Sequence, residues 1–476
     1  MRKDYLLLIL FPFPFSLFPT LTVLYLISPT YLHMSKRQQR RHNPFGNRGD
    51  KPGDSRQSFQ VDRDRILYSS AFRRLAQITQ VLTAQEGHVF HNRLTHTLKV
   101  AQVARRLAER LVAEQPEVAV AVGGIDPDVV EAAALAHDLG HPPFGHTAEE
   151  ELNACAVRAG LADGFEGNAQ SFRIVTRLAI HRIDYYGLNL TRATLNALLK
   201  YPWLRSPDTA SKRHRKYSIY HQDLEAFKFA RLEPGDFQSI EASIMDFADD
   251  ITYSVHDLED FYLAGLIPLE LLATDWDELD RFINEWLRVS PNNPIAKVVR
   301  ANPHRFQNFL DATYNLKGQY PPGSFEQKAQ IKRISSQLIQ TYIQSVQLTT
   351  KYDDRGYLKY NRNREEELQF LQRIVWAYVI SNPRLATQRY GQKRIIKTLF
   401  EIYLQAISDR DLSFIPPRFV REFLELEAKL GSATEPSPEQ TRMAVDIVAG
   451  LSEAEAIIQY RRLIGISQGS FLDSWN

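Results

Sequence analysis

The sequence contains a single cysteine, Cys155, among its 476 residues. One cysteine excludes an intramolecular disulfide and is typical of a protein from a reducing compartment. It also excludes a zinc site built from several cysteines, so any metal ion would have to be held by histidine and carboxylate side chains. The formal net charge of only +2 excludes a general polyelectrolyte role, and an acidic partner would have to meet a local basic patch.

Strand patterns and phosphate-binding glycine loops are also lacking. The chain has no long alternating apolar and polar run, no glycine-rich phosphate loop and no internal repeat. Apolar residues recur instead at intervals of three and four, which is the period of an amphipathic helix. The segments predicted to be helical include 62–78, 94–111, 168–180, 238–262, 366–380 and 393–407. The sequence therefore predicts an all-α protein.

The chain begins with an uncharged, apolar stretch. Residues 5–32 are long enough to cross a bilayer. Four prolines interrupt them: Pro12, Pro14, Pro19 and Pro29. No small-residue cleavage pattern follows, and the polar sequence after Met34 is typical of the start of a soluble protein. We therefore expect a cytoplasmic protein in which residues 1–33 are a leader outside the mature chain, with an uncleaved membrane anchor as the alternative.

Three regions are expected after this leader. They are a flexible basic arm at 34–58, a helical core at 59–273 and a helical C-terminal region at 274–476. The arm contains four cations, Lys36, Arg37, Arg40 and Arg41, and is expected to be a solvated tail, with a nucleic-acid or subunit contact as the alternative. A second basic run, at 212–216, lies in a predicted loop.

One short stretch concentrates the groups that carry chemistry. Its three histidines and two carboxylates are His137, Asp138, His141, His146 and Glu149. The apolar run 129–136 before it predicts a buried helix, which Gly140 and two prolines then end. Burial of a histidine–aspartate pair is costly without a cation or hydrogen-bond partners. The stretch therefore indicates a functional site rather than core histidines.

A metal site follows from the spacing of these groups. His96, near the start of one predicted helix, and the pair His137 and Asp138, at the end of another, can converge with a carboxylate from 238–262. Two imidazoles and two carboxylates suit a divalent ion such as Mn²⁺ or Mg²⁺ with open coordination positions. Adjacent residues do not face the same way on a helix, so the pair can share an ion only where the helix ends.

Helix geometry selects the fourth ligand. Asp249, Tyr253 and Asp257 are spaced by four residues, so one helix face carries all three. Asp250 points about 100° away from that face. We therefore predict Asp249 as the ligand. The alternative, that these acids lie on a solvated surface, is retained for Asp246, Glu259 and Asp260.

Two further groups lie beside the predicted ligands. Glu149 is three residues after His146 and can hold one nitrogen of its ring, which would orient the histidine as a general acid or base. A pair that merely caps a new helix is the alternative. Arg93 shares a helix face with His96 and is placed to bind a phosphate through two hydrogen bonds; the alternative is a surface ion pair.

These residues resemble those of the bacterial dGTPase (deoxynucleotide triphosphohydrolase) family, within the HD superfamily of metal-dependent phosphohydrolases. The similar motifs are SSAFRRL at 69–75, HNRLTH at 91–96, HDLGHPPFGH at 137–146, FEGNAQ at 165–170 and ADDITYS at 248–254. The pattern His…His-Asp…Asp is moderately specific, and the ten-residue string at 137–146 is highly specific.

The resemblance implies an all-helical HD core with a helical C-terminal extension. It also implies attack of water on the α-phosphorus of a dNTP, which releases a deoxynucleoside and intact triphosphate. Members of the family assemble as hexamers or other homo-oligomers, and some are activated by nucleotide or bind single-stranded DNA. The apolar residues before Met34 depart from the family pattern.

The resemblance also assigns roles to individual residues. The metal ligands would be His96, His137, Asp138 and Asp249. The catalytic pair would be His146 and Glu149. Contacts to the substrate would come from Arg93 (phosphate), His141 (near the α-phosphate) and Gln80, Tyr253 and Asp257 (sugar), with Tyr253 as a steric gate against a 2′-hydroxyl.

Two other functions compete with this prediction. A different HD enzyme, a phosphodiesterase or nucleotidase, would lack the extension at 142–146. A non-catalytic nucleic-acid-binding protein would use the basic arm and the run 212–216, and its binding would depend steeply on salt. That protein would have no need for four metal ligands beside an acid/base pair.

Overall fold

The structure is a computed structural model that describes most of the chain. The described ranges are 36–43, 53–80, 91–233, 235–306, 323–353, 356–380, 386–430 and 436–467, with single positions between 307 and 322. The predicted leader at 1–33 lies outside the described residues. Within the described part, no helix has the length and apolar character needed to cross a membrane.

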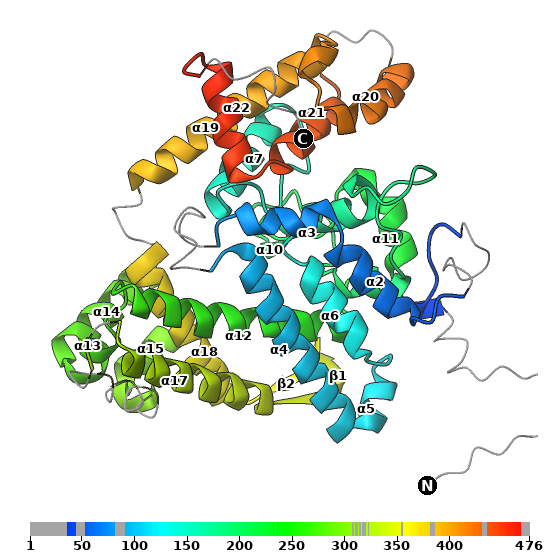
Figure 1. Cartoon of the computed structure of the whole chain (residues 1–476). Coiled ribbons are helices and arrows are strands. Elements are labelled where there is room, and N and C mark those ends of the chain that lie inside the picture. The colour runs from blue at the N-terminus through cyan, green and yellow to red at the C-terminus, as the bar shows by residue number, and fades with distance from the viewer. Residues whose placement is uncertain are drawn as a thin grey trace, which may run out of the picture.

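Three helices form the centre of the molecule. They are α4 (Arg93–Glu114), α6 (Pro127–Ala136) and α12 (Ile240–Leu263), which pack against one another (Figure 1). Each begins at a side chain that accepts a hydrogen bond from the first turn: Asn92, Asp126 and Ser239 respectively. Alanines along α6 are fully buried and let its neighbours approach closely. The predicted helices at 94–111, 129–136 and 238–262 are confirmed.

The other helices surround this centre. Before α12 they are α2 (Ser58–Leu67), α3 (Ser70–Arg74), η1 (Leu75–Gln77), α5 (Pro116–Ala121), α7 (His146–Arg158), α8 (Gly167–Arg173), η3 (Ile174–Leu178), α9 (Arg192–Ala197), α10 (Lys212–Arg215), η4 (His221–Asp223) and α11 (Leu224–Ala230). After α12 they are α13 (Leu269–Thr274), α14 (Trp276–Val289), α15 (Pro294–Ala301), η5 (Pro303–Phe306), α17 (Phe325–Gln344), α18 (Arg362–Val375), η6 (Trp376–Ile380), α19 (Ala386–Ser408), η8 (Leu412–Phe414), α20 (Pro417–Leu430), α21 (Pro438–Ala449) and α22 (Glu453–Leu463).

One strand pair was not predicted from the sequence. β1 (Val346–Asp353) and β2 (Gly356–Tyr360) form an antiparallel hairpin, with Val346 opposite Tyr360 and Leu348 opposite Leu358. These paired apolar side chains are buried or partly buried against the helices, and this packing stabilises a strand pattern too short to stand out in the sequence. Because this small sheet is the only one in the described residues, the predicted all-α class is confirmed.

Two hydrophobic clusters hold the helices together. The larger cluster extends from Phe59 to Val379 and continues across the predicted boundary at residue 273. The smaller cluster joins Phe144 and α7 to side chains of α19, α20 and α21. In Figure 1, α7 accordingly lies among the C-terminal helices. The end of the chain therefore packs directly on the helix that follows the histidine-rich stretch.

The prediction of a flexible, solvated arm is wrong for residues 36–43. Arg40 is buried and forms an ion pair with Asp62, and its Nη1 also donates to the carbonyl of Asn189 at 2.8 Å. Arg37 is buried against Glu241 at 2.5 Å. Two buried carboxylates, 22 and 204 residues away in the sequence, are thus paired with two cations from this segment. Local composition does not reveal this pairing.

Candidate active site

The three central helices bring four predicted side chains together. His96 lies in the first turn of α4, His137 is the residue at which α6 ends, Asp138 follows it and Asp249 lies on α12. Donor atoms of His96, His137 and Asp138 lie within 4.8 Å of one another. Asp249 Oδ1 is 3.2 Å from His96 Nε2 and 3.7 Å from His137 Nε2. The end of α6 therefore lets adjacent residues face one centre.

The orientation of His137 fits a metal ligand. Its Nδ1 lies 2.7 Å from the carbonyl of Ala134, which fixes the proton on that nitrogen. Its buried Nε2 has no hydrogen-bond partner in the described residues and faces Asp138 at 3.4 Å. Burial alone would lower the pKa of His137, but Asp138 and Asp249 raise it to about 9. The site thus favours a positive charge at this nitrogen, which a divalent cation would satisfy.

Two further side chains, those of Arg93 and His141, contact the carboxylate of Asp138. Arg93 Nη1 donates to Asp138 Oδ2 at 2.7 Å, and His141 Nδ1 lies 3.1 Å from Oδ1. Burial alone would raise the pKa of Asp138, but His137, Arg93 and His141 hold it well below its usual range. Arg93 is only 2% exposed, which excludes the surface ion pair that the sequence left open. Its guanidinium lies at the site and orients a predicted ligand.

Asp249 has a cationic partner that the sequence did not indicate. Lys200 Nζ lies 3.1 Å from Asp249 Oδ2 and 2.6 Å from Asp246 Oδ1. Burial alone would lower the pKa of Lys200, but the two aspartates raise it well above its ordinary value. The lysine is therefore charged at the site. Asp246 belongs to this network and is not one of the solvated surface acids that the sequence left open.

Glycines shape the turn between the two histidine groups. A Cβ on Gly140 would lie 2.1 Å from the carbonyl oxygen of Gly167 and 2.3 Å from the amide of Ser171, so only glycine lets α8 approach this closely. Gly145 has a φ of 58° and precedes α7. The turn therefore places His146 at the start of a new helix.

His146 and Glu149 form the predicted pair. Nδ1 of His146 lies 2.8 Å from Glu149 Oε2, and Glu149 Oε1 accepts the amide of Gly167 at 3.1 Å. Burial alone would raise the pKa of Glu149, but His146 and Lys216 hold it well below its usual range. Glu149 is therefore ionised and holds the Nδ1 proton of His146, whose side chain is 69% exposed. This leaves Nε2 available for proton transfer.

The predicted sugar contacts are only partly brought together. Tyr253 and Gln80 line the cavity that contains the four converging side chains. Asp257 is buried but does not line that cavity. Burial and the neighbouring Asp260 raise the pKa of Asp257 well above its ordinary value. Its distance from the cavity follows from the α-helical rise, which carries it two turns beyond Asp249.

The cavity has a volume of about 690 Å³ and a cationic wall. Beside the predicted residues, it is lined by Lys200, Lys216, Arg389 and Lys393. Lys216 lies at the end of the basic run 212–216, and the last two residues come from α19. Of these four cations, only Lys216 belongs to a pattern that stands out in the sequence. That pattern, the basic run 212–216, was interpreted as a possible nucleic-acid contact and not as part of the cavity wall.

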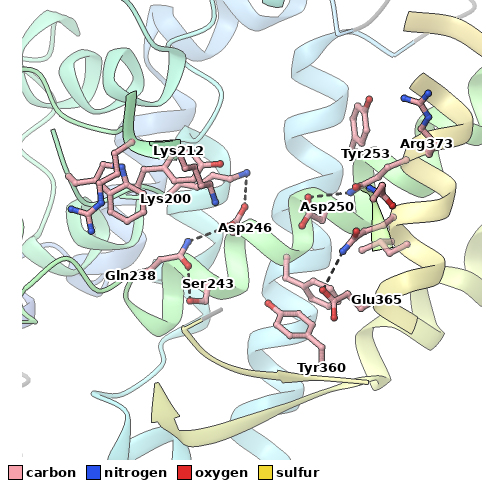
Figure 2. A pocket seen from close by; sticks show the side chains of 18 of the residues that line it. Lys200, Lys212, Gln238, Ser243, Asp246, Asp250, Tyr253, Tyr360, Glu365 and Arg373 are labelled. Atoms are coloured by element: carbon pink, nitrogen blue, oxygen red, sulfur yellow. Dashed lines mark hydrogen bonds and ion pairs between the residues drawn. The ribbon is translucent and has the colours of Figure 1, made fainter. Parts of the chain in front are cut away.

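A second cavity of about 950 Å³ adjoins the first along α12. Figure 2 shows Asp246 turned towards Lys200 and Asp250 turned towards α18, where Gln372 Nε2 donates to Asp250 Oδ1 at 3.4 Å. Burial and Asp246 raise the pKa of Asp250 to about 7. The two cavities share Tyr253 and Lys200 on their common wall. The side chains of Asp249 and Asp250 therefore point to different sides of α12, as the helix period predicted.

A second group of side chains that could bind a metal ion already makes hydrogen bonds within the protein. His141, His146 and Glu149 have donor atoms within 4.8 Å of one another. Both oxygens of Glu149 contact hydrogen-bond partners, His146 and the amide of Gly167. The donor set of the first group, with an unpaired imidazole nitrogen between carboxylates, fits a metal ion better.

The fold and this site define the class of protein. The HD domain family matches residues 93–254, and the phosphohydrolase-associated domain family matches residues 358–462. The first match spans α4, α6 and most of α12, and therefore all four converging side chains. The protein is an HD-domain phosphohydrolase, a class that binds a divalent metal ion.

Relatives named deoxyguanosinetriphosphate triphosphohydrolase-like protein resemble the whole chain. The Corynebacterium efficiens protein is 35% identical over 433 residues, which cover 87% of this chain and 93% of the relative. The Streptomyces coelicolor protein is 36% identical over 434 residues, covering 87% and 94%. The Brucella suis protein is 32% identical over 438 residues, covering 88% and 94%. The chain belongs to this family of deoxyguanosinetriphosphate triphosphohydrolase-like proteins, which confirms the resemblance found in the sequence.

Proposed function

We propose that the protein hydrolyses a deoxynucleoside triphosphate to a deoxynucleoside and intact triphosphate. The observation that carries this proposal is the set of four cations, Lys200, Lys216, Arg389 and Lys393, that line the same cavity as the four predicted ligands. The triphosphate part of the substrate carries several negative charges, and fixed cations would hold it and stabilise the charge that develops on the α-phosphate oxygens as water attacks and the bond to the 5′-oxygen of the deoxynucleoside breaks. A phosphomonoester or a single phosphodiester would need fewer of these groups.

The four predicted metal ligands would make the α-phosphate more electrophilic. A divalent ion held by His96, His137, Asp138 and Asp249 would polarise the α-phosphate oxygens and lower the pKa of bound water. Arg93 keeps Asp138 ionised and oriented through its 2.7 Å hydrogen bond. Lys200 balances the charge of Asp249 and lies at the cavity wall, where phosphate oxygens would be bound.

His146 supplies the proton transfer. Because Glu149 holds its Nδ1, the Nε2 atom of His146 can protonate the departing oxygen of the deoxynucleoside or accept a proton from the attacking water. His141 lies between the predicted metal ligands and the pair of His146 and Glu149. Its ring centroid is 5.4 Å from that of His146, and its Nδ1 is 3.1 Å from Asp138 Oδ1. We propose that His141 contacts the α-phosphate.

The test separates the products of each dNTP. The protein is incubated with the four dNTPs, singly and mixed, with Mn²⁺ or Mg²⁺, and the phosphate products are separated by anion exchange. We expect intact triphosphate and a deoxynucleoside in equal amounts. Pyrophosphate or orthophosphate would identify another HD phosphohydrolase. No product from metal-loaded protein would favour a non-catalytic binding protein.

Tyr253 is proposed to exclude ribonucleotides. Its ring lines the cavity one helical turn beyond Asp249, where it would meet the 2′-hydroxyl of a bound ribose. Tyr253→Ala is expected to raise the kcat/KM of a ribonucleotide relative to its deoxy form by about tenfold or more, as opening a pocket wall relaxes steric selection. Tyr253→Phe, which keeps the ring, is the control and should retain selectivity. Unchanged selectivity in the alanine variant would remove Tyr253 from this role.

A further inference from the structure

A buried carboxylate near the end of the chain contacts two separate segments that line the candidate active site. Glu453 is the first residue of α22, within the phosphohydrolase-associated domain. Its Oε1 accepts the backbone amide of Thr79 at 2.7 Å and that of Phe144 at 3.1 Å. These partners are 374 and 309 residues away in the sequence, and Glu453 is only 6% exposed.

The backbone that Glu453 contacts is conformationally unfavourable. Phe144 has a φ of 69°, in the left-handed region that a residue with a Cβ rarely adopts, and Gly145 follows with a φ of 58°. Such a conformation persists only where surrounding contacts impose it. The Phe144 ring is buried in the smaller hydrophobic cluster, and its amide is held by Glu453. His146 comes two residues after Phe144, so its position depends on the backbone conformation of Phe144 and Gly145.

A second side chain, Arg74, links the same turn to the segment just before α22. Arg74 donates through Nη2 to the carbonyls of Leu139 at 2.7 Å and His141 at 2.8 Å. Its Nη1 donates to the carbonyl of Leu451 at 3.0 Å, two residues before Glu453. The turn is therefore attached to the C-terminal region both before and after its prolines.

The other partner of Glu453 belongs to a different segment of the cavity wall. Thr79 pairs with Asn92 at the start of α4 and lines the cavity beside Gln80. One carboxylate oxygen thus links the wall that carries Gln80 to the turn that carries His146. An acid at a helix N-terminus is favoured by the helix dipole alone, but that effect requires neither burial nor amides from two distant segments.

We propose that Glu453 is a positioning residue that holds the Phe144 backbone against Thr79 and so directs His146 into the cavity. The C-terminal domain would then complete the geometry of a site whose ligands all lie in the HD domain. This proposal rests on the proposed function, because the position of His146 matters only if His146 transfers a proton.

The experiment compares three variants of the full chain. Glu453→Ala removes the acceptor of both amides. Glu453→Gln keeps an acceptor oxygen of the same reach without the charge. Glu455→Ala is the matched control: Glu455 caps the amide of Ser452 at 2.7 Å in the same helical turn and does not contact the histidine-rich turn. For each variant, kcat, KM and metal content are measured with dNTPs, and amide hydrogen exchange is followed in peptides that cover 139–148.

We expect Glu453→Ala to lower kcat by about tenfold or more, with normal metal content and a smaller change in KM, as is usual for groups that orient a functional residue. Exchange at 139–148 should become faster, whereas exchange in α12 should not change. Glu453→Gln should restore most of the rate. Glu455→Ala should keep kcat within about twofold of the unaltered chain, because it removes a helix cap and weakens a charge interaction with Arg74 but leaves the acceptor of the Thr79 and Phe144 amides in place.

Three results would contradict either this proposal or the proposed function, and they can be told apart. Equal losses in Glu453→Ala and Glu455→Ala would mean that Glu453 only stabilises α22, and would overturn the proposal. Unchanged kcat in Glu453→Ala would overturn it as well. If Glu453→Ala does not fold, Glu453→Asp, which keeps the charge and shortens the reach, must show the loss of kcat. If the unaltered chain hydrolyses no dNTP, the proposed function fails, and hydrogen exchange alone decides whether Glu453 holds the turn.

Discussion

Alanine at His137 or Asp138 is expected to abolish both metal retention and dNTP hydrolysis. His137 presents an unpaired Nε2 to the centre, and Asp138 contributes a carboxylate that Arg93 and His141 keep ionised. Removal of either donor leaves buried charges without their counterpart, which disrupts the site more than the loss of one ligand bond. Metal content after gel filtration and the rate of triphosphate release measure the two effects.

A pair of adjacent aspartates provides the control for this prediction. Asp249→Ala should also lose the metal, because its Oδ1 lies 3.2 Å from His96 Nε2. Asp250→Ala should keep the metal, because that side chain is turned towards Gln372 on α18. A His137→Ala protein that retained a full equivalent of metal would remove His137 from the ligand set, and metal loss in Asp250→Ala would refute the helix-face argument.

Alanine at His146 is expected to keep the metal and to lower kcat by about 10² to 10⁴, the usual contribution of a general acid or base. The protein should remain folded, because this side chain is 69% exposed and substitutions at such positions change stability by about 0.5 kcal/mol or less. Metal content, a thermal melting curve and kcat with the preferred dNTP test all three expectations.

A second exposed histidine–carboxylate pair is the matched control. His221 Nδ1 lies 2.5 Å from Asp163 Oδ1, and its side chain is 60% exposed, yet it does not line the cavity. His221→Ala should therefore leave kcat unchanged. A full rate in His146→Ala would refute the acid/base assignment. Glu149→Gln should give a smaller loss than His146→Ala, because the amide still accepts one hydrogen bond while the ring loses its ionic partner.

Local sequence patterns were sufficient to predict the helices that carry the four converging side chains. The apolar period predicted α4, α6 and α12, and the glycine and prolines after Asp138 predicted where α6 ends. Because a helix end lets adjacent side chains face one point, the convergence of His137 and Asp138 followed from the chain itself. The same period separated Asp249 from Asp250, which the structure places on different sides of α12.

The pairing of distant charges could not be predicted in this way. Lys200 follows a short helix in a stretch without a distinctive motif, yet it balances Asp246 and Asp249. Arg37 and Arg40 lie in a polar segment that composition classed as solvated, yet both are buried against carboxylates. Each carboxylate lies outside the local segment of its cation. Helical periods and turn patterns therefore do not predict which cation pairs with which carboxylate.

The sequence by itself determined the all-helical class, the convergence of His96, His137, Asp138 and Asp249, and the membership of a phosphohydrolase family. These depend on helix period, helix ends and short motifs, all of which act over a few residues. The tertiary structure alone decided that Arg389, Lys393 and Glu453 of the C-terminal region reach the cavity or its walls. Those contacts depend on the packing of α19, α21 and α22 on α7 and the turn before it. Packing of this kind is set by the shapes and buried areas of whole helices, and no short stretch of sequence contains that information.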